Sequence, residues 1–187
     1  MRNLKSIALA LVALATFTVN AQTKKINVSK STINWVGKKV TGSHEGTITL
    51  KEGALIFKGK KLVGGNFTVD MTTINTTDLE GKGKTNLDGH LKSDDFFGVE
   101  KFKTATLVFK NISTKNKNNY TVTADLTIKG ITKPVTFDLV VNGNTASANV
   151  KIDRTKYDIK YGSGSFFSDL GDKTINDEFE LKVNLAW

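Results

Sequence analysis

From residue 30 onward, the chain alternates apolar and polar side chains over most of its length. The clearest case is the last segment, where apolar residues occupy every second position from Phe179 to Trp187. Apolar residues at a period of two place one apolar face on a β-strand. The pattern recurs in the segments 30–37, 46–51, 66–71, 105–109, 120–128, 135–141, 146–153 and 178–187. Turn-forming residues such as 142–144 separate neighbouring segments, so the pattern predicts seven or eight antiparallel strands.

Each predicted strand has a single apolar face, and these faces must meet inside the protein. A closed β-barrel satisfies this requirement, and a β-sandwich is the alternative because it uses the same alternation. An eight-stranded barrel is wide enough to be filled by its own side chains or to hold one small ligand. Several inward positions carry small residues, which leave space: Gly46, Ala105, Ala124, Ala146 and Ala148. The sequence therefore predicts an all-β, antiparallel, eight-stranded barrel with room for a ligand.

The alternation stops between residues 72 and 102, and this long insertion contains helical signals. Two leucines lie four residues apart, and Ser93 precedes two acidic residues in the manner of a helix N-cap. We expect residues 89–98 to form a short helical lid or plug over the barrel. Phe96 and Phe97 then cannot both point outward, and at least one of them should contact the lumen.

The first 21 residues have the pattern of a signal peptide. A basic start precedes the apolar run 7–19, and Ala21 ends a small-residue cleavage site. The apolar run is too short to span a bilayer comfortably, and no later segment resembles a transmembrane helix. We therefore expect residues 22–187 to form one exported domain that is periplasmic or secreted. Because the chain has no cysteine, it has no disulfide and no lipid-modified N-terminal cysteine.

The formal net charge of +9 could attract nucleic acid, anionic lipid or wall polymers. The lysines are scattered along the strands, however, and a solvated β-surface explains them more simply. The basic turn 115–119 lacks the interleaved aromatic residues that bind single-stranded nucleic acid, so nucleic acid is not an expected partner. Residues 81–85 resemble the end of a phosphate-binding loop, but Asp78 stands where that motif requires its first glycine.

The only histidines, His44 and His90, are the candidates for acid–base or metal chemistry. They are not spaced as a metal-binding pair, so neither a metal site nor a cofactor is expected. If the alternation of residues 46–50 extends backwards without a bulge, His44 lies on the inner face of its strand. The simpler interpretation of this position is an interior histidine whose hydrogen bonds are satisfied by the protein.

Arg154 has the parity of the inward residues in the predicted strand 146–153. A guanidinium does not lose its proton, so an inward Arg154 needs a carboxylate, carbonyl oxygens or a polar ligand group beside it. Alternatively, the strand ends at Ile152 and Arg154 reaches outward to a nearby aspartate. The sequence leaves both interpretations open.

Four motifs follow one another along the chain. They are Trp35-x-Gly37-Lys38-Lys39-x-x-Gly42-x-His44-x-Gly46, His90-Leu91-Lys92-Ser93-x-Asp95-Phe96-Phe97, Leu126-Thr127-Ile128-Lys129-Gly130-Ile131-Thr132-Lys133-Pro134-Val135 and Asp153-Arg154-x-x-Tyr157-x-Ile159-x-Tyr161-Gly162. In this order and with these gaps, they resemble the YceI-like family over nearly the whole of residues 22–187. Residues 98–102 depart from the family because they lack the proline that often precedes its phenylalanine. The resemblance implies an exported, lipocalin-like antiparallel barrel that binds a polyisoprenoid or another long-chain amphiphile in its lumen.

We therefore expect a lipid carrier rather than an enzyme. Each buried methylene contributes about 0.8 kcal/mol, so a long apolar chain can bind tightly with few polar contacts. His44 and Arg154 are predicted to lie near the polar head group of the ligand. The residues predicted to hold its apolar chain are aromatic and inward-facing: Trp35, Phe67, Phe96, Phe97, Phe109 and Phe137.

Two other classes of function are alternatives. An enzyme acting on a lipid-like substrate would use His44 or His90 as its acid or base. A basic scaffold would bind polyanions or a stress-response partner, and its binding would depend steeply on salt. The sequence does not decide between a monomer and a homodimer.

Overall fold

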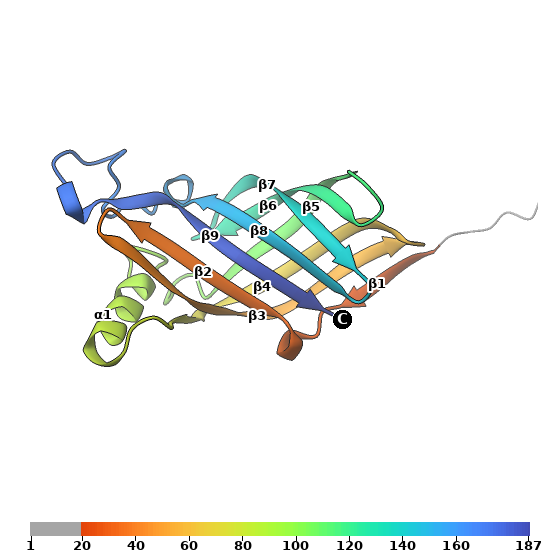
Figure 1. The fold of residues 1–187 in the computed structure, drawn as a ribbon, viewed down its shortest axis with the longest axis horizontal. Coiled ribbons are helices and arrows are strands. Elements are labelled where there is room, and N and C mark those ends of the chain that lie inside the picture. The colour runs from red at the N-terminus through yellow and green to blue at the C-terminus, as the bar shows by residue number, and fades with distance from the viewer. Residues whose placement is uncertain (1–19) are drawn as a thin grey trace, which may run out of the picture.

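The computed structural model of the chain describes residues 20–187, which form nine strands, one α-helix and three short 3-10 helices (Figure 1). Residues 1–19 of the predicted signal peptide lie outside the described part, so that prediction stays a prediction. The strands are β1 (Ala21–Lys25), β2 (Thr32–Lys39), β3 (Gly42–Lys58), β4 (Lys61–Thr76), β5 (Thr104–Thr114), β6 (Asn119–Ile128), β7 (Ile131–Asn142), β8 (Thr145–Asp153) and β9 (Ile175–Ala186). The helices are η1 (Val28–Lys30), α1 (Gly81–Lys92), η2 (Arg154–Tyr157) and η3 (Gly171–Lys173).

The strands form one antiparallel sheet that closes on itself. The order along the sheet is β1-β3-β2-β9-β8-β7-β6-β5-β4, and pairing between β3 and β4 closes the ring. Strand β1 pairs with residues 54–58 of β3, and β2 pairs with residues 42–48 along the same edge. The short β1 and the longer β2 therefore share one position in a closed eight-stranded barrel. The predicted barrel is confirmed, and the β-sandwich alternative is wrong.

Strands β3 and β4 are much longer than the sequence pattern indicated. The pairing register between them shifts at three places, between residues 47 and 49, 50 and 52, and 56 and 57. A bulge inserts an extra residue and reverses the inward and outward positions that follow it. Strict alternation is therefore lost inside a continuous strand, which is why the pattern located only part of each.

The helix lies earlier in the chain than predicted. Helix α1 ends at Lys92, and Ser93 terminates it: the Ser93 N–H contacts the carbonyl oxygens of Gly89 and His90 at 3.0 and 3.1 Å. The Ser93 hydroxyl donates to the same His90 oxygen at 2.8 Å, so the prediction of Ser93 as an N-cap is wrong. Residues 93–98 follow as tight turns. We call α1 together with residues 93–98 the lid.

Two polar side chains of α1 fix the lid to the end of β4. The Asp88 carboxylate accepts the main-chain N–H of Thr76 at 2.7 Å. The Lys84 ammonium donates to the Thr76 carbonyl oxygen, to the Asn75 side chain and to Asp88. The lysine of the apparent phosphate-loop motif therefore has a structural role.

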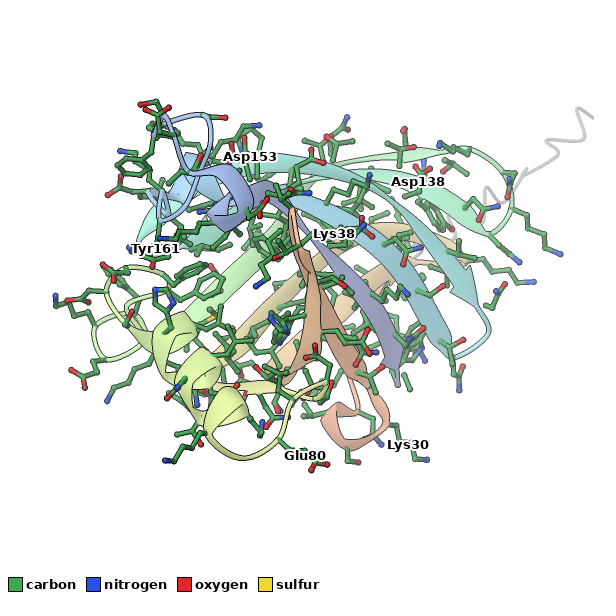
Figure 2. The ribbon with its side chains drawn as sticks, turned by 60° about the vertical axis from the view of Figure 1, so that its left-hand side comes forward. Lys30, Lys38, Glu80, Asp138, Asp153 and Tyr161 are labelled. Atoms are coloured by element: carbon green, nitrogen blue, oxygen red, sulfur yellow. The ribbon has the colours of Figure 1, made fainter. Side chains whose placement is uncertain are left out.

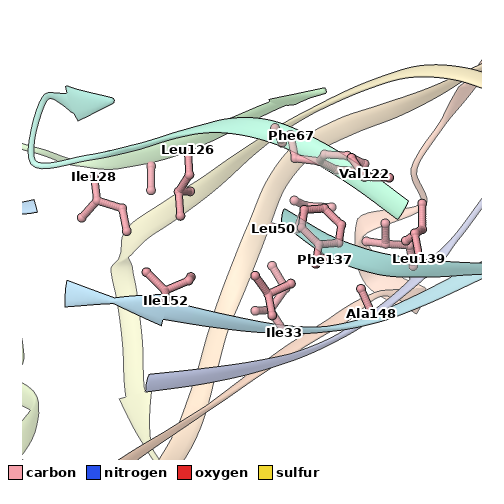
Figure 3. Packing of buried hydrophobic residues seen from close by; sticks show 14 of the residues in the cluster. Ile33, Leu50, Phe67, Val122, Leu126, Ile128, Phe137, Leu139, Ala148 and Ile152 are labelled. Carbon is pink, nitrogen blue, oxygen red and sulfur yellow. The ribbon is translucent and has the colours of Figure 1, made fainter. Parts of the chain in front are cut away.

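The two ends of the barrel differ in construction. The lid and the long connection 154–174, which we call the mouth loop, lie at one end, the mouth (Figure 1). The turns 59–60, 115–118 and 143–144 lie at the opposite end, the far end. Figure 3 shows part of the core, in which Phe67, Val122, Phe137 and Leu139 lie apart from Leu126, Ile128 and Ile152 along the barrel.

Candidate functional site

A cavity of about 150 Å³ lies inside the barrel beneath the lid, and its lining is almost entirely apolar. The lining side chains come from strands on all sides of the barrel, because the inward positions of each strand point to one centre. The wall residues include Ile33, Trp35, Ile48, Val69, Met71, Ile74, Ala105, Leu126, Ile128, Ile152, Phe179 and Leu181. Such a lining can hold an apolar group and offers few hydrogen-bond partners to a polar one.

The lid contributes Leu91, Phe96 and Phe97 to the cavity wall. The Phe97 ring stands edge-on to Phe179 of β9, with 6.3 Å between the ring centroids. Phe96 is buried and lies 6.3 Å from the Phe97 ring. Both phenylalanines therefore line the lumen, whereas the sequence led us to expect this of at least one of them.

Only half of the aromatic residues predicted to hold a ligand line the cavity. Trp35, Phe96 and Phe97 do. The other three form a row of rings in the packed core, with centroids 5.6 Å apart for Phe67–Phe109 and 6.0 Å apart for Phe109–Phe137. None of these three lines the cavity, because the parity of a strand residue gives its face but not its depth in the barrel; their role in holding a ligand stays a prediction.

Trp35 fills the space beside Gly46, where the sequence predicted room for a ligand. Its indole lies over Gly46, where a Cβ atom would come within 2.5 Å of the ring. The indole N–H donates to the Thr47 carbonyl oxygen at 3.3 Å. The same Cβ would come even closer to the Asn75 main-chain oxygen, so glycine at position 46 makes room for the β4 backbone and the tryptophan rather than for a ligand.

Arg154 is buried at the edge of the cavity, and four of the five N–H groups of its guanidinium donate to main-chain carbonyl oxygens. Its side chain is 4% exposed. Nε donates to the Asn176 carbonyl oxygen at 3.0 Å, and Nη2 donates to that of Ile175 at 3.0 Å. Nη1 donates to the carbonyl oxygens of Ile159 and Tyr161 at 2.8 and 2.9 Å. These bonds join the first part of the mouth loop to the start of β9.

The charge of Arg154 also has protein partners. Burial lowers its pKa, and the carboxylate of Asp177, 3.5 Å from Nη2, opposes that shift. The guanidinium carbon lies 5.8 Å from the centre of the Phe96 ring, a cation–π distance. The sequence interpretation in which Arg154 reaches outward is wrong. Its prediction as a head-group ligand stays a prediction, since its N–H groups already serve the mouth loop.

His44 lies on the inner-face parity of β3 but outside the cavity lining. Its Nδ1 is 2.9 Å from an Asp78 oxygen, and the other Asp78 oxygen accepts the Glu45 N–H at 3.1 Å. Partial burial raises the pKa of Asp78, but these hydrogen bonds outweigh it and hold the pKa below its usual value. His44 thus connects β3 to the segment before α1. Its role near a ligand head group stays a prediction.

His90 belongs to an aromatic cluster that joins the lid to the mouth loop. Its ring stands edge-on to Tyr161 and to Phe96, with centroid distances of 4.4 and 4.9 Å. The Phe96 and Tyr161 rings are 5.8 Å apart. Figure 2, which is turned toward the mouth, shows Tyr161 on the side of the mouth loop that faces the lid. An Asp95 carboxylate oxygen lies 3.9 Å from Nε2 of His90.

Within residues 20–187, no group of three or more His, Cys, Asp or Glu side chains is placed to hold a metal ion. The same part of the chain contains no helix that is both long and apolar enough to cross a membrane.

A family described as "YceI-like domain" matches residues 17–187 of the chain. Among curated proteins, a UPF0312 protein of Staphylococcus aureus (strain USA300) is 50% identical over 56 residues, which are 30% of this chain and 30% of that protein. The chain therefore spans about a third of the length of that relative in the match.

Several solved structures share the fold. BcnA of Burkholderia cenocepacia is 24% identical, with a TM-score of 0.69 over 87% of this chain and 99% of that one. The YceI protein of Campylobacter jejuni is 17% identical, with a TM-score of 0.55 over 98% and 88%. A domain of Saccharophagus degradans described as polyisoprenoid-binding is 13% identical, with a TM-score of 0.57 over 86% and 95%.

Proposed function

Because the chain belongs to the YceI-like domain family, we propose that it is a carrier that holds the apolar chain of an isoprenoid or fatty amphiphile in its barrel. The observation that carries the proposal is the cavity, which the barrel encloses with aliphatic and aromatic side chains and the lid covers with three more. The structural likeness to a polyisoprenoid-binding domain supports the same class of ligand. The proposed role is binding rather than catalysis.

The volume of the cavity determines how a long chain would enter. A cavity of about 150 Å³ is the size that holds a single benzene ring in a protein core. Pockets for larger ligands measure roughly 300–1,000 Å³. A chain of several isoprene units therefore requires the cavity to widen, and we propose that the lid moves outward to allow this. The aromatic cluster and the bonds of Lys84 and Asp88 hold the lid in its closed position.

We also propose that the protein is exported to a periplasm or secreted, on the pattern of its first 21 residues. Intact mass measurement of the protein from the extracytoplasmic fraction tests this directly. A mass that corresponds to a chain beginning near residue 22 supports export, whereas a full-length cytoplasmic protein contradicts it.

Native mass spectrometry and solvent extraction of the purified protein test the carrier function. We expect a bound apolar molecule, or uptake of an added isoprenoid alcohol or fatty amide that shifts the tryptophan fluorescence through Trp35, which lines the cavity. Ala105→Phe should block uptake, because Ala105 lines the cavity. Phe67→Leu is the control, because Phe67 is buried outside the lining. No bound molecule and no uptake by the folded wild type would refute the proposal.

A further inference from the structure

Exposed apolar side chains gather around the mouth of the barrel. Phe166 and Phe167 in the mouth loop are each 51% exposed. Within residues 20–187, the mouth end holds four of the six large apolar side chains classed as exposed: Val40, Tyr161, Phe166 and Phe167. The Val40 N–H donates to the Thr174 carbonyl oxygen at 3.1 Å, which places the β2–β3 turn beside the end of the mouth loop.

The mouth loop is built so that its two phenylalanines face outward. Ser163 is fully buried, and its carbonyl oxygen accepts the N–H groups of Phe166 and Phe167 at 3.2 and 3.0 Å. The Ser163 hydroxyl accepts the N–H of Ser165 at 3.2 Å. Arg154 fixes the base of the same loop through four carbonyl oxygens. An ordered turn with a buried anchor therefore displays the two rings, and exposed apolar surface of this kind marks an interaction site.

Tyr161, a third exposed ring of the mouth loop, contacts the lid that covers the cavity. Its ring contacts His90 and Phe96 of the lid, and Phe96 lines the cavity. On the solvent side, the Lys160 ammonium lies 5.1 Å from the centre of the Phe166 ring. The loop carries acidic residues as well, at 158, 169 and 172, so its charge is mixed. Attraction to this surface must therefore come mainly from apolar contact.

We propose that the mouth loop docks on a lipid bilayer by inserting Phe166 and Phe167 among the lipid head groups and upper acyl chains. Aromatic rings beside lysines occupy this interfacial layer, since the ring reaches apolar atoms while the ammonium stays in water. A bilayer is favoured over a protein partner because the patch borders the mouth of an apolar cavity, and long-chain apolar molecules reside in bilayers. This argument rests on the proposed carrier function.

Vesicle sedimentation tests the docking with a matched pair of double variants. Phe166→Ser with Phe167→Ser removes the patch, whereas Val63→Ser with Val108→Ser removes two apolar side chains, 44% and 43% exposed, away from the mouth. With phosphatidylcholine vesicles, we expect the first pair to weaken partitioning about tenfold or more and the second to leave it unchanged. Equal partitioning of wild type and the phenylalanine variant, or no partitioning at all, overturns the proposal.

Docking through the far end is a distinguishable outcome. Lys24, Lys60 and Lys117 line one groove there, and no carboxylate of residues 20–187 lies within 4.0 Å of their ammonium groups. If binding requires anionic lipid and is lost when these three lysines become Gln, the far end rather than the mouth docks, and the proposal is wrong. If Phe166→Trp gives a blue-shifted emission on vesicles that the wild type, with Trp35 and Trp187 alone, does not show, the mouth loop inserts as proposed.

Uptake measured without vesicles separates this proposal from the carrier function. The Phe166 and Phe167 variant should take up a soluble short-chain isoprenoid alcohol as well as the wild type, because neither residue lines the cavity. If the wild type takes up nothing yet docks through these phenylalanines, the carrier function fails and the docking stands. If uptake is normal but docking does not depend on them, the docking proposal fails alone.

Discussion

Replacement of Arg154 tests how the mouth of the barrel is held together. Arg154→Met keeps much of the apolar stem but removes the guanidinium that donates to four carbonyl oxygens of residues 159, 161, 175 and 176. It also leaves the partly buried Asp177 without its positive partner. Removing one member of a buried ionic network costs about 3–5 kcal/mol, because the remaining groups are left unpaired.

The loss should appear locally rather than across the whole barrel. Two acceptors lie in the first part of the mouth loop and two at the start of β9, whereas the rest of the barrel keeps its own ladder of hydrogen bonds. A free-energy change of 3–5 kcal/mol corresponds to an increase of roughly two to four orders of magnitude in the opening equilibrium. Hydrogen exchange should therefore accelerate by about this factor at the amides of Ile159, Ser163 and Ile175. The amide of Val122 in β6 should keep its protection.

Two further variants make the result specific to the guanidinium. Lys156→Met removes the same charge two residues away, from a side chain that is 62% exposed, and should leave the exchange rates unchanged. Arg154→Lys keeps the charge but not the planar fork, so it should fall between the wild type and Arg154→Met. The reasoning would be contradicted if the mouth loop of Arg154→Met exchanged its amide hydrogens at the wild-type rates, or if Lys156→Met accelerated exchange equally.

Three other changes have defined outcomes. The double variant Phe96→Ser with Phe97→Ser opens the lid side of the cavity and should speed ligand dissociation about tenfold or more, measured by stopped-flow displacement. If the loss of ligand retention is matched by an equal loss of stability, seen as a lower melting point, the two residues serve only as core residues. The pKa of Asp78 is lower in the folded protein than its unfolded value of about 4, so the carboxylate stabilises the fold above pH 4, and this stabilisation is lost as the pH falls through the folded pKa. Asp78→Asn should remove this acid dependence of the unfolding free energy in denaturant titrations. An unchanged pH profile in the variant would contradict the reasoning. Gly46→Ala should displace Trp35 and the Asn75 main chain and so shift the tryptophan emission, and an unaltered spectrum would contradict the close approach.

The barrel could be predicted from the sequence because each strand buries one face, and its apolar residues therefore recur at every second position. Strand β1 escaped prediction since its residues 21–25 contain no large apolar side chain, and tertiary pairing with β3 defines it. The helix of the lid was predicted too far along the chain because Ser93 before two acidic residues fits an N-cap. In the structure, the Ser93 hydroxyl instead donates to the carbonyl oxygen of His90, which precedes it in the chain. The same residue type can bond in either direction, and only the fold selects one.

The candidate site was harder to predict for physical reasons. Alternation identified the inner faces that carry Trp35 and Phe67, but it does not indicate how far along the barrel axis each side chain lies. Arg154 bonds to carbonyl oxygens, which every residue possesses, so no side-chain type in the sequence signals its partners. Asp78 is 34 residues from His44, and nothing local connects them.

The contacts at the mouth couple the lid to the mouth loop. The proposed outward movement of the lid displaces Phe96, whose ring contacts His90 and Tyr161 and lies near the Arg154 cation. The carbonyl oxygen of Tyr161 is itself held by Arg154. A force that moves the mouth loop therefore acts on the ring that closes the cavity. If the loop docks on a bilayer as proposed, the lid is loosened where an apolar acceptor is present, and in water the same contacts keep it closed.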